Sequence, residues 1–172
     1  MPKKFGTGLF IGRFQPFHNG HMHAIRDAGS LCNELVVGVG SAQKSRTTDN
    51  PLPASVRIRI IKSALKESAA IKAKIMFLEI PDFHDNERWF AYIRKKVPKL
   101  DVVFSGNPIV KTIFRGHDIQ VIAPKWYNRA DLSGTKVRAV IRRSGKWERM
   151  VPKGAVSVIK ANERAITAGP KQ

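Results

Sequence analysis

The stretch G-L-F-I-G-R-F-Q-P-F-H-N-G-H, residues 8–21, decides the fold of this chain. Its apolar start predicts a strand over 9–12, and a helix is expected over 21–30. The polar residues between them therefore form the turn from a first strand into a first helix. Such turns bind anions, because unpaired N–H groups point out of the helix start and the helix dipole favours negative charge. His18 and His21 add side-chain donors, so we expect an anionic ligand, in particular a nucleotide.

The alternation of strands and helices continues along the chain. Further strands are predicted over 35–39, 75–80, 101–105 and 119–122. Further helices are predicted from Pro53, over 86–97, from Pro108, from Ser133 and over 152–161. Repeated β-α units of this length indicate an α/β protein with a three-layer, Rossmann-like, doubly wound and mainly parallel sheet. We expect one domain over residues 1–164, with 165–172 as a frayed tail.

Composition narrows the class of protein. The chain has 172 residues and a net charge of +18, with one cysteine, Cys32, which excludes an intramolecular disulfide. No apolar stretch approaches the ~18 residues of a membrane helix, and the basic N-terminus does not continue as a signal peptide, so we expect a cytoplasmic protein without a membrane partner. The charge attracts polyanions, but the basic residues are spread along the chain without interleaved aromatics. This pattern favours a solvated surface over a nucleic-acid face.

Five polar clusters follow the five predicted strands. They lie at 12–21, 40–45, 81–89, 105–108 and 126–135. Ligands of doubly wound folds bind at the carboxyl ends of the strands, so the clusters predict one shared site. Taken singly, each has a simpler explanation: Ser133 can be an ordinary helix N-cap, and Trp89 can belong to the core. The two histidines can also bind a metal, but no cysteine or carboxylate lies nearby in sequence to complete such a site.

The last cluster has the composition of a phosphate cradle. Ser133 and Thr135 supply hydroxyls at the start of a predicted helix, where free backbone N–H groups also lie. Arg138, three residues beyond Thr135, adds a guanidinium that can bind a phosphate with two parallel hydrogen bonds.

These residues resemble a known superfamily, the adenylyl- and cytidylyltransferases, which carries H-x-G-H after the first strand and S-x-T-x-x-R at a late helix. Within it, the chain is most similar to the archaeal-type nicotinamide-nucleotide adenylyltransferases. The shared motifs are G-R-F-Q-P-F-H-x-G-H at 12–21, G-S-A-Q at 40–43, D-x-x-x-N-x-x-W at 82–89, S-G-N-P at 105–108 and S-G-T-x-V-R at 133–138. The outer two indicate the superfamily, and the middle three narrow it to this enzyme.

The resemblance implies a reaction of ATP with nicotinamide mononucleotide that gives NAD and pyrophosphate, by in-line attack of the mononucleotide phosphate on the α-phosphate. It implies catalytic roles for His18, His21 and Arg138. The implied ATP-binding residues are Gly12, Arg13, Phe14, His18, His21, Gly106, Asn107, Tyr127, Ser133, Thr135 and Arg138. The implied mononucleotide-binding residues are Asp82, Asn86 and Trp89, together with Arg46 or Arg57. Mg²⁺ is expected to arrive with ATP rather than on protein ligands, and archaeal relatives suggest a homohexamer.

The chain also departs from the family pattern. The family commonly has an arginine in the loop after G-S-A-Q, where Asp49 and Asn50 precede Pro51 here. A Glu-Arg pair of the family is Val56-Arg57 in this chain. The arginine that serves the mononucleotide phosphate is therefore open between Arg46 and Arg57.

Two other functions remain open at this point. A sister adenylyltransferase, acting on pantetheine phosphate or flavin mononucleotide, would share the outer motifs. The cluster of Asp82, Asn86 and Trp89 argues against it, because a tryptophan face suits the pyridinium ring of nicotinamide mononucleotide. A basic nucleic-acid-binding α/β protein would account for the charge and leave the five clusters without a role.

Overall fold

The computed structural model describes residues 3–66, 68, 71–125, 127 and 132–168. The chain forms two compact units. Unit 1 comprises residues 1–12, 25–40 and 70–125, and unit 2 comprises residues 13–24, 41–69 and 126–172.

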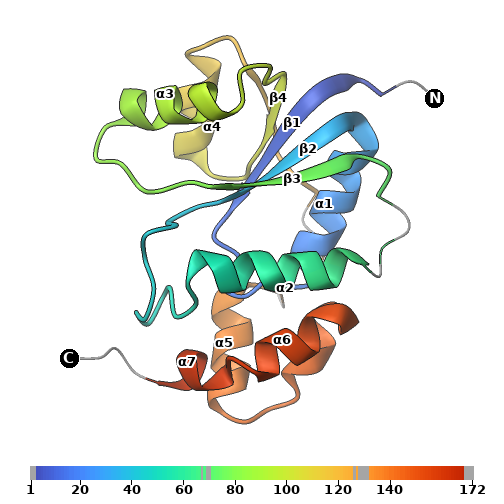
Figure 1. Ribbon diagram of the computed structural model, residues 1–172, viewed down its shortest axis with the longest axis vertical. Coiled ribbons are helices and arrows are strands. Elements are labelled where there is room, and N and C mark those ends of the chain that lie inside the picture. Colours follow the sequence, from blue (N-terminus) through green and yellow to red (C-terminus); the bar gives the residue numbers. More distant parts are fainter. Residues whose placement is uncertain (1–2, 67, 69–70, 126, 128–131, 169–172) are drawn as a thin grey trace. The chain divides into compact units, whose positions relative to one another are not determined.

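Unit 1 is built on a five-stranded sheet (Figure 1). Its strands are β1 (Phe5–Gly12), β2 (Cys32–Val39), β3 (Lys74–Glu79), β4 (Val102–Phe104) and β5 (Gln120–Ile122). They lie in the order β3-β2-β1-β4-β5, and all four pairings are parallel. The predicted α/β, Rossmann-like sheet with mainly parallel strands is confirmed.

The first two strands begin earlier than their apolar runs do. The register of β1 and β2 pairs Phe5 with Cys32 and Thr7 with Glu34, so the ladder continues into polar sequence. Hydrophobic runs mark the buried middle of a strand, whereas its ends depend on the neighbouring strand.

The strand order fixes where a ligand can bind in unit 1. From the central β1 the chain proceeds outward to β2 and β3, then returns to β4 and β5 on the other side. The order therefore reverses between β1 and β4. In doubly wound sheets the ligand crevice lies outside the carboxyl ends of the strands at this reversal, which here are Gly12 and Phe104.

Two helices cover one face of this sheet, α3 (Asn86–Lys96) and α4 (Pro108–Arg115). Their buried side chains join those of β1, β2 and β4 in a core cluster that comprises Leu9, Val36, Ile80, Ile93, Val97, Leu100, Val103, Val110 and Phe114. Helix α3 ends at Lys96, one residue before the predicted end at residue 97, and Pro98 follows its C-cap residue. Helix α1 (Asn19–Leu31) contributes its second half to this unit.

Unit 2 is mainly helical. It contains the first half of α1, α2 (Ala54–Lys66), α5 (Gly134–Arg142), the 3₁₀ turns η1 (Trp147–Met150) and η2 (Lys153–Ala155), α6 (Val156–Lys160) and α7 (Glu163–Thr167). Helix α2 packs against η2 and α6, and α5 packs against α7 and η1. No helix among the described residues is long and apolar enough to cross a membrane.

The C-terminal region differs in detail from the expectation. The helix expected over 152–161 is the turn η2 followed by α6, and η1 and α7 were not expected. Residues 165–167, expected to be frayed, are helical. The physical reason is that the Ile166 side chain is fully buried and its carbonyl accepts a hydrogen bond from Arg142 Nε at 3.1 Å.

Candidate active site

The turn after β1 carries a strained and buried aromatic residue. Phe14 has a φ of 52°, in the left-handed region that bulky residues rarely adopt. Its ring is 1% exposed and packs against Phe17, with 5.9 Å between ring centroids, and against His21 at 4.9 Å. Such strain clusters at functional sites. With 1% of the whole residue exposed, Phe14 is part of the core.

His18 and His21 stack on each other, with 3.6 Å between ring centroids. The backbone N–H of His18 donates to Nδ1 of His21 at 3.3 Å. A neutral imidazole has one donor and one acceptor nitrogen, so the proton of His21 lies on Nε2. Nδ1 of His18 is buried and has no hydrogen-bond partner among the described residues. An unpaired buried polar atom is costly, and it points to a ligand group that completes the site.

Both histidines are neutral at pH 7. Burial lowers the pKa of His18 to about 4. The pKa of His21 lies well below its usual value, first because of burial and second because of repulsion by His18. The pair therefore offers uncharged N–H donors rather than imidazolium charges.

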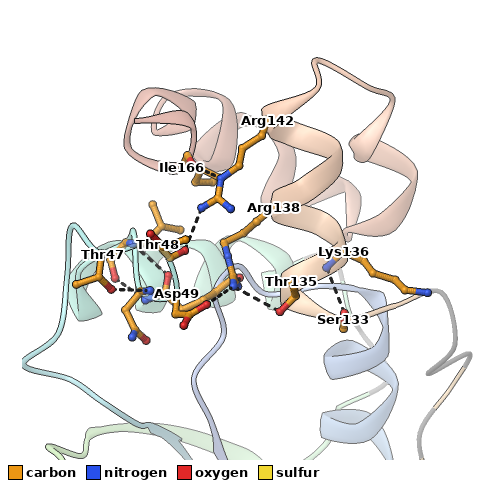
Figure 2. A network of polar contacts seen from close by, with 12 residues as sticks. Thr47, Thr48, Asp49, Ser133, Thr135, Lys136, Arg138, Arg142 and Ile166 are labelled. Carbon is orange, nitrogen blue, oxygen red and sulfur yellow. Dashed lines mark hydrogen bonds and ion pairs between the residues drawn. The ribbon is translucent and has the colours of Figure 1, made fainter. Parts of the chain in front are cut away.

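The N-terminus of α5 lies against the same turn. A Cβ atom at Gly134 would lie 2.7 Å from the carbonyl oxygen of Gln15, so this approach requires glycine. That oxygen also accepts a hydrogen bond from Nη1 of Arg138 at 2.8 Å. Ser133 is the N-cap of α5, because its Oγ accepts the backbone N–H of Lys136 at 3.2 Å (Figure 2). The structure thus brings the first and the last sequence motif together within unit 2.

Arg138 is a buried cation, with its side chain 4% exposed. Its Nη2 donates to Asp49 Oδ1 at 3.2 Å and to Thr135 Oγ1 at 3.4 Å (Figure 2). Its Nε is buried without a hydrogen-bond partner among the described residues. Burial lowers the pKa of Arg138 from its usual value, the charge of Asp49 opposes this shift, and Arg142 and Arg13 add to it. Arg138 stays charged, since guanidinium groups do not deprotonate in proteins.

The loop after β2 is held by two buried side chains. The guanidinium of Arg57 is 0% exposed and donates to the carbonyls of Arg13 at 2.9 Å and Ser41 at 3.0 Å. The side-chain amide of Gln15 donates to the carbonyl of Leu52 at 2.8 Å and accepts its N–H at 3.1 Å. Arg57 therefore ties the turn at residue 13 to the loop at residue 41.

The other candidate arginines in this region are exposed. Arg46 has a left-handed φ of 58°, and its backbone N–H donates to the carbonyl of Pro51 at 3.3 Å. The side chain of Arg13 is also exposed. Both side chains are available to a ligand in a way that the guanidinium of Arg57 is not.

The mononucleotide candidates lie at the start of α3 in unit 1. Asp85 caps the helix, because its Oδ1 accepts the backbone N–H of Arg88 at 3.0 Å. Asp82 and Asn86 are exposed on either side of this cap. Trp89 is half-buried and meets Phe114 in a T-shaped arrangement with 5.8 Å between ring centroids. Part of its indole thus belongs to the core.

The adenosine candidates lie in both units. In unit 1, Gly106 and Asn107 are exposed, and Asn107 caps α4 by accepting the N–H of Ile109 at 2.9 Å. Gly12 ends β1, and its carbonyl accepts the N–H of Gly40 at 2.9 Å. In unit 2, Tyr127 is 58% exposed and stacks on His23 at 4.1 Å. The remaining residues of the cluster from 126 to 131 lie outside the described residues.

The roles of Gln15, Asp49 and Asp85 could not be predicted from the motifs. Gln15 had one signal, a polar residue inside an aromatic motif. Asp49 had another, an acid in the loop where the family commonly has an arginine. Asp85 followed the general preference of helix N-caps for aspartate.

Comparisons with known proteins agree with these motifs. The family model described as Cytidylyltransferase-like matches residues 9–140. A nicotinamide-nucleotide adenylyltransferase of Methanococcus aeolicus is 39% identical over 151 residues, which cover 88% of this chain and 86% of the relative. Another from Thermococcus onnurineus is 39% identical over 160 residues, covering 93% of this chain and 83% of the relative. The chain belongs to the nicotinamide-nucleotide adenylyltransferases.

Solved structures of other proteins have the same fold as this chain. A bifunctional NMN adenylyltransferase/ADP ribose pyrophosphatase from Francisella tularensis, complexed with AMP and a manganese ion, has a TM-score of 0.78 at 18% identity. The match covers 94% of this chain and 52% of that protein, so the chain spans about half its length. A nicotinate-nucleotide adenylyltransferase from Vibrio parahaemolyticus, described as putative, has a TM-score of 0.70 at 11% identity and is covered to 98%.

Proposed function

We propose that this nucleotidyltransferase joins ATP and nicotinamide mononucleotide to give NAD and pyrophosphate. The observation that carries the proposal is the contact between the turn at residues 13–18 and the first turn of α5. It gathers His18, His21 and Arg138 with the free N–H groups of a helix N-terminus in one unit. This set of donors suits a triphosphate.

The chemistry places few demands on proton transfer. The attacking group is a phosphate oxygen that is already anionic, so no strong general base is required. The barrier comes from repulsion between two polyanions and from charge that builds up on the transferred phosphoryl group and on pyrophosphate. We assign Arg138, Thr135 and the N–H groups of α5 to the outer phosphates of ATP. The proton on Nε2 of His21 is assigned to an oxygen of the transferred phosphoryl group.

A divalent metal, Mg²⁺ in this proposal, would neutralise part of the phosphate charge. No three His, Cys, Asp or Glu side chains gather as a metal site among the described residues. Arg13 and Arg142 add positive charge near Arg138, which fits a metal held mainly by phosphate oxygens and water rather than by protein ligands.

The acceptor pocket is assigned to α3. The nicotinamide ring is a pyridinium, and the exposed part of the Trp89 face offers it stacking and a cation–π attraction of about 0.5–2 kcal/mol. Asp82 and Asn86 flank the helix start and are assigned to the amide and the ribose. For the phosphate we favour Arg46 over Arg57, because the side chain of Arg46 is exposed and the guanidinium of Arg57 donates to two backbone carbonyls.

The assembly and the location are also proposals. A homohexamer follows from the resemblance to archaeal enzymes, and light scattering after size-exclusion chromatography would test it. A cytoplasmic location and a single domain over residues 1–164 stay predictions.

The reaction is tested by measuring pyrophosphate release from ATP with a panel of acceptors. The panel contains nicotinamide mononucleotide, its acid form, pantetheine phosphate and flavin mononucleotide. We expect the highest kcat/KM with nicotinamide mononucleotide, and formation of NAD at the same rate as pyrophosphate. If neither nicotinamide mononucleotide nor its acid form gives pyrophosphate release, the proposal is contradicted. Faster release with pantetheine phosphate or flavin mononucleotide would instead identify a sister enzyme.

A further inference from the structure

Asp49 is the acidic side chain that faces Arg138. Its Oδ1 lies 3.2 Å from Nη2 of the guanidinium, and its side chain is 72% exposed (Figure 2). Arg13 and Arg142 are close enough to Arg138 to disfavour its charge, whereas Asp49 favours it. Asp49 therefore supplies negative charge among three arginines, at the position where a phosphate would otherwise do so.

The loop, rather than the attraction alone, holds Asp49 in this place. Nη2 of Arg142 donates to the carbonyl of Thr48 at 3.0 Å, directly before Asp49. The N–H of Asn50 donates to Oγ1 of Thr47 at 3.0 Å, and the N–H of Thr47 donates to the carbonyl of Asn50 at 3.3 Å. These bonds close the loop into a compact turn with Asp49 on the side of Arg138 (Figure 2).

A phosphate that approaches Arg138 finds few of its donors available. Nη1 is engaged with the carbonyl of Gln15, and the side chain is only 4% exposed. Nη2 donates to both Asp49 and Thr135, and Nε, which has no hydrogen-bond partner among the described residues, is buried. A phosphate that binds through Nη2 must therefore displace the Asp49 carboxylate or accept its repulsion at close range.

We propose that Asp49 is an internal competitor for the phosphate site, which holds Arg138 in the ligand-free enzyme and weakens the binding of ATP and of pyrophosphate. The proposal rests on the assignment of Arg138 to the outer phosphates of ATP. Because the same groups hold pyrophosphate after the reaction, Asp49 also speeds the release of this product. Its exposed side chain can turn into solvent when a phosphate arrives, so the competition is reversible.

The test is the affinity of the protein for inorganic pyrophosphate, measured by titration calorimetry without Mg²⁺ and without an acceptor. Asp49→Asn removes the charge and keeps the size of the side chain. We expect about threefold to fivefold tighter binding, the range of an ion pair with one exposed partner. Asp49→Glu keeps the charge and is expected to bind as the wild type does within about twofold.

Glu148→Gln is the matched control. Glu148 lies in the same unit, and its side chain pairs with Lys160 at 3.2 Å. This substitution changes the net charge by the same amount as Asp49→Asn but leaves Arg138 untouched. Unchanged binding in Glu148→Gln shows that the gain in Asp49→Asn comes from the local contact.

The outcomes separate this inference from the proposed function. Pyrophosphate that binds the wild type and Asp49→Asn equally overturns the role of Asp49 and leaves the phosphate site standing. No binding to either the wild type or Asp49→Asn overturns the phosphate site and the competitor together. Weaker binding of magnesium pyrophosphate to Asp49→Asn identifies Asp49 as a metal ligand and overturns the competition. If Asp49→Asn does not fold, Asp49→Ser gives the same measurement, and steady-state kinetics adds a fall in the KM for ATP without a rise in kcat.

Discussion

His18 and His21 are neutral in the ligand-free protein at pH 7, because burial holds the pKa of His18 at about 4 and that of His21 well below its usual value. At the scale of single residues this makes the pair a fixed source of hydrogen bonds. The bond from the His18 N–H to Nδ1 of His21 selects the tautomer with the proton on Nε2. A donor that is already oriented costs no reorganisation when charge develops in the transition state.

Removing the His21 donor is expected to affect turnover more than binding. His21→Ala should lower kcat at least about 100-fold, the usual effect of losing one donor to developing charge, and weaken ATP binding less than about tenfold. Pyrophosphate release gives kcat, and calorimetry with ATP gives the affinity. His117→Gln, in unit 1, serves as the control. Unchanged turnover in His21→Ala would remove His21 from the reaction.

Burial of His18 also makes stability depend on pH. Above pH 6.5 His18 is neutral in both the folded and the unfolded chain. Below pH 6.5 the unfolded chain binds a proton at His18, whereas the folded protein does so only near pH 4. The free energy of unfolding should therefore fall as pH falls, by about 2 kcal/mol between pH 7.5 and pH 5 from His18 alone. Urea unfolding of the wild type and His18→Asn at both pH values measures this loss. The same loss in both proteins would contradict the prediction.

At the scale of elements, the geometry of the candidate site depends on the turns that follow β1 and β2. Phe14 and Ser41 have left-handed backbones, and Arg57 on α2 donates to the carbonyls of Arg13 and Ser41 beside them. A helix residue thus fixes two strained turns at once. Its guanidinium is suited to this because it reaches two acceptors in one plane.

Replacing that guanidinium is expected to loosen both turns. Arg57→Lys can reach only one of the two carbonyls, so the free energy of unfolding should fall by about 1–3 kcal/mol. We expect a lower kcat/KM for both substrates, because one guanidinium holds the turns at residues 13 and 41 and its loss changes both. Arg59→Lys, an exposed position on the same helix, should change neither quantity. A change confined to the KM for the mononucleotide would instead place Arg57 on its phosphate.

The start of α3 carries the residues that we assign to the acceptor. Trp89→Phe keeps an aromatic ring against Phe114 but offers a smaller and weaker face to a pyridinium. The KM for nicotinamide mononucleotide should rise by more than the KM for ATP, which steady-state kinetics with each substrate varied in turn would show. Equal effects on both constants would exclude stacking on Trp89.

The order of strands and helices follows from local sequence, and the details of the site do not. Apolar runs predicted all five strands, and capping residues such as Ser133 predicted the start of α5. The early start of β1 at Phe5 depends on pairing with Cys32, which no local pattern contains. In the same way, Arg57 meets carbonyls 16 and 44 residues away, and Arg138 meets Asp49 across 89 residues. Such roles arise only when distant turns come together.

At the scale of the whole molecule, the charge is unevenly divided between the two units. Unit 2 holds 18 basic and 5 acidic residues, which is +13 of the total +18. This unit also holds the histidine pair and Arg138. A strong positive field around a phosphate site raises the local concentration of anionic substrates and their association rate.

The rate of capture should therefore depend on salt. We expect kcat/KM for ATP to fall severalfold between about 0.05 M and 0.5 M KCl, because the Debye length shrinks from roughly 14 Å to 4 Å, while kcat changes little. Stopped-flow or steady-state measurements over this range provide the test, with tetramethylammonium chloride as a second salt to exclude a specific effect of potassium. A kcat/KM independent of salt would leave the charge without a role in substrate capture.

The hydrogen bonds of Arg142 have a consequence for mutations that truncate the C-terminal region. The guanidinium of Arg142 donates to the carbonyls of Thr48 and Ile166. Helix α7, which contains Ile166, is therefore linked through Arg142 to the turn that carries Asp49. A nonsense or frameshift mutation just before Glu163 would spare every motif, yet it would remove this link and the carboxylate that accepts the indole N–H of Trp147. Such an allele would keep all the sequence motifs, but in its product the turn that carries Asp49 would be less firmly held.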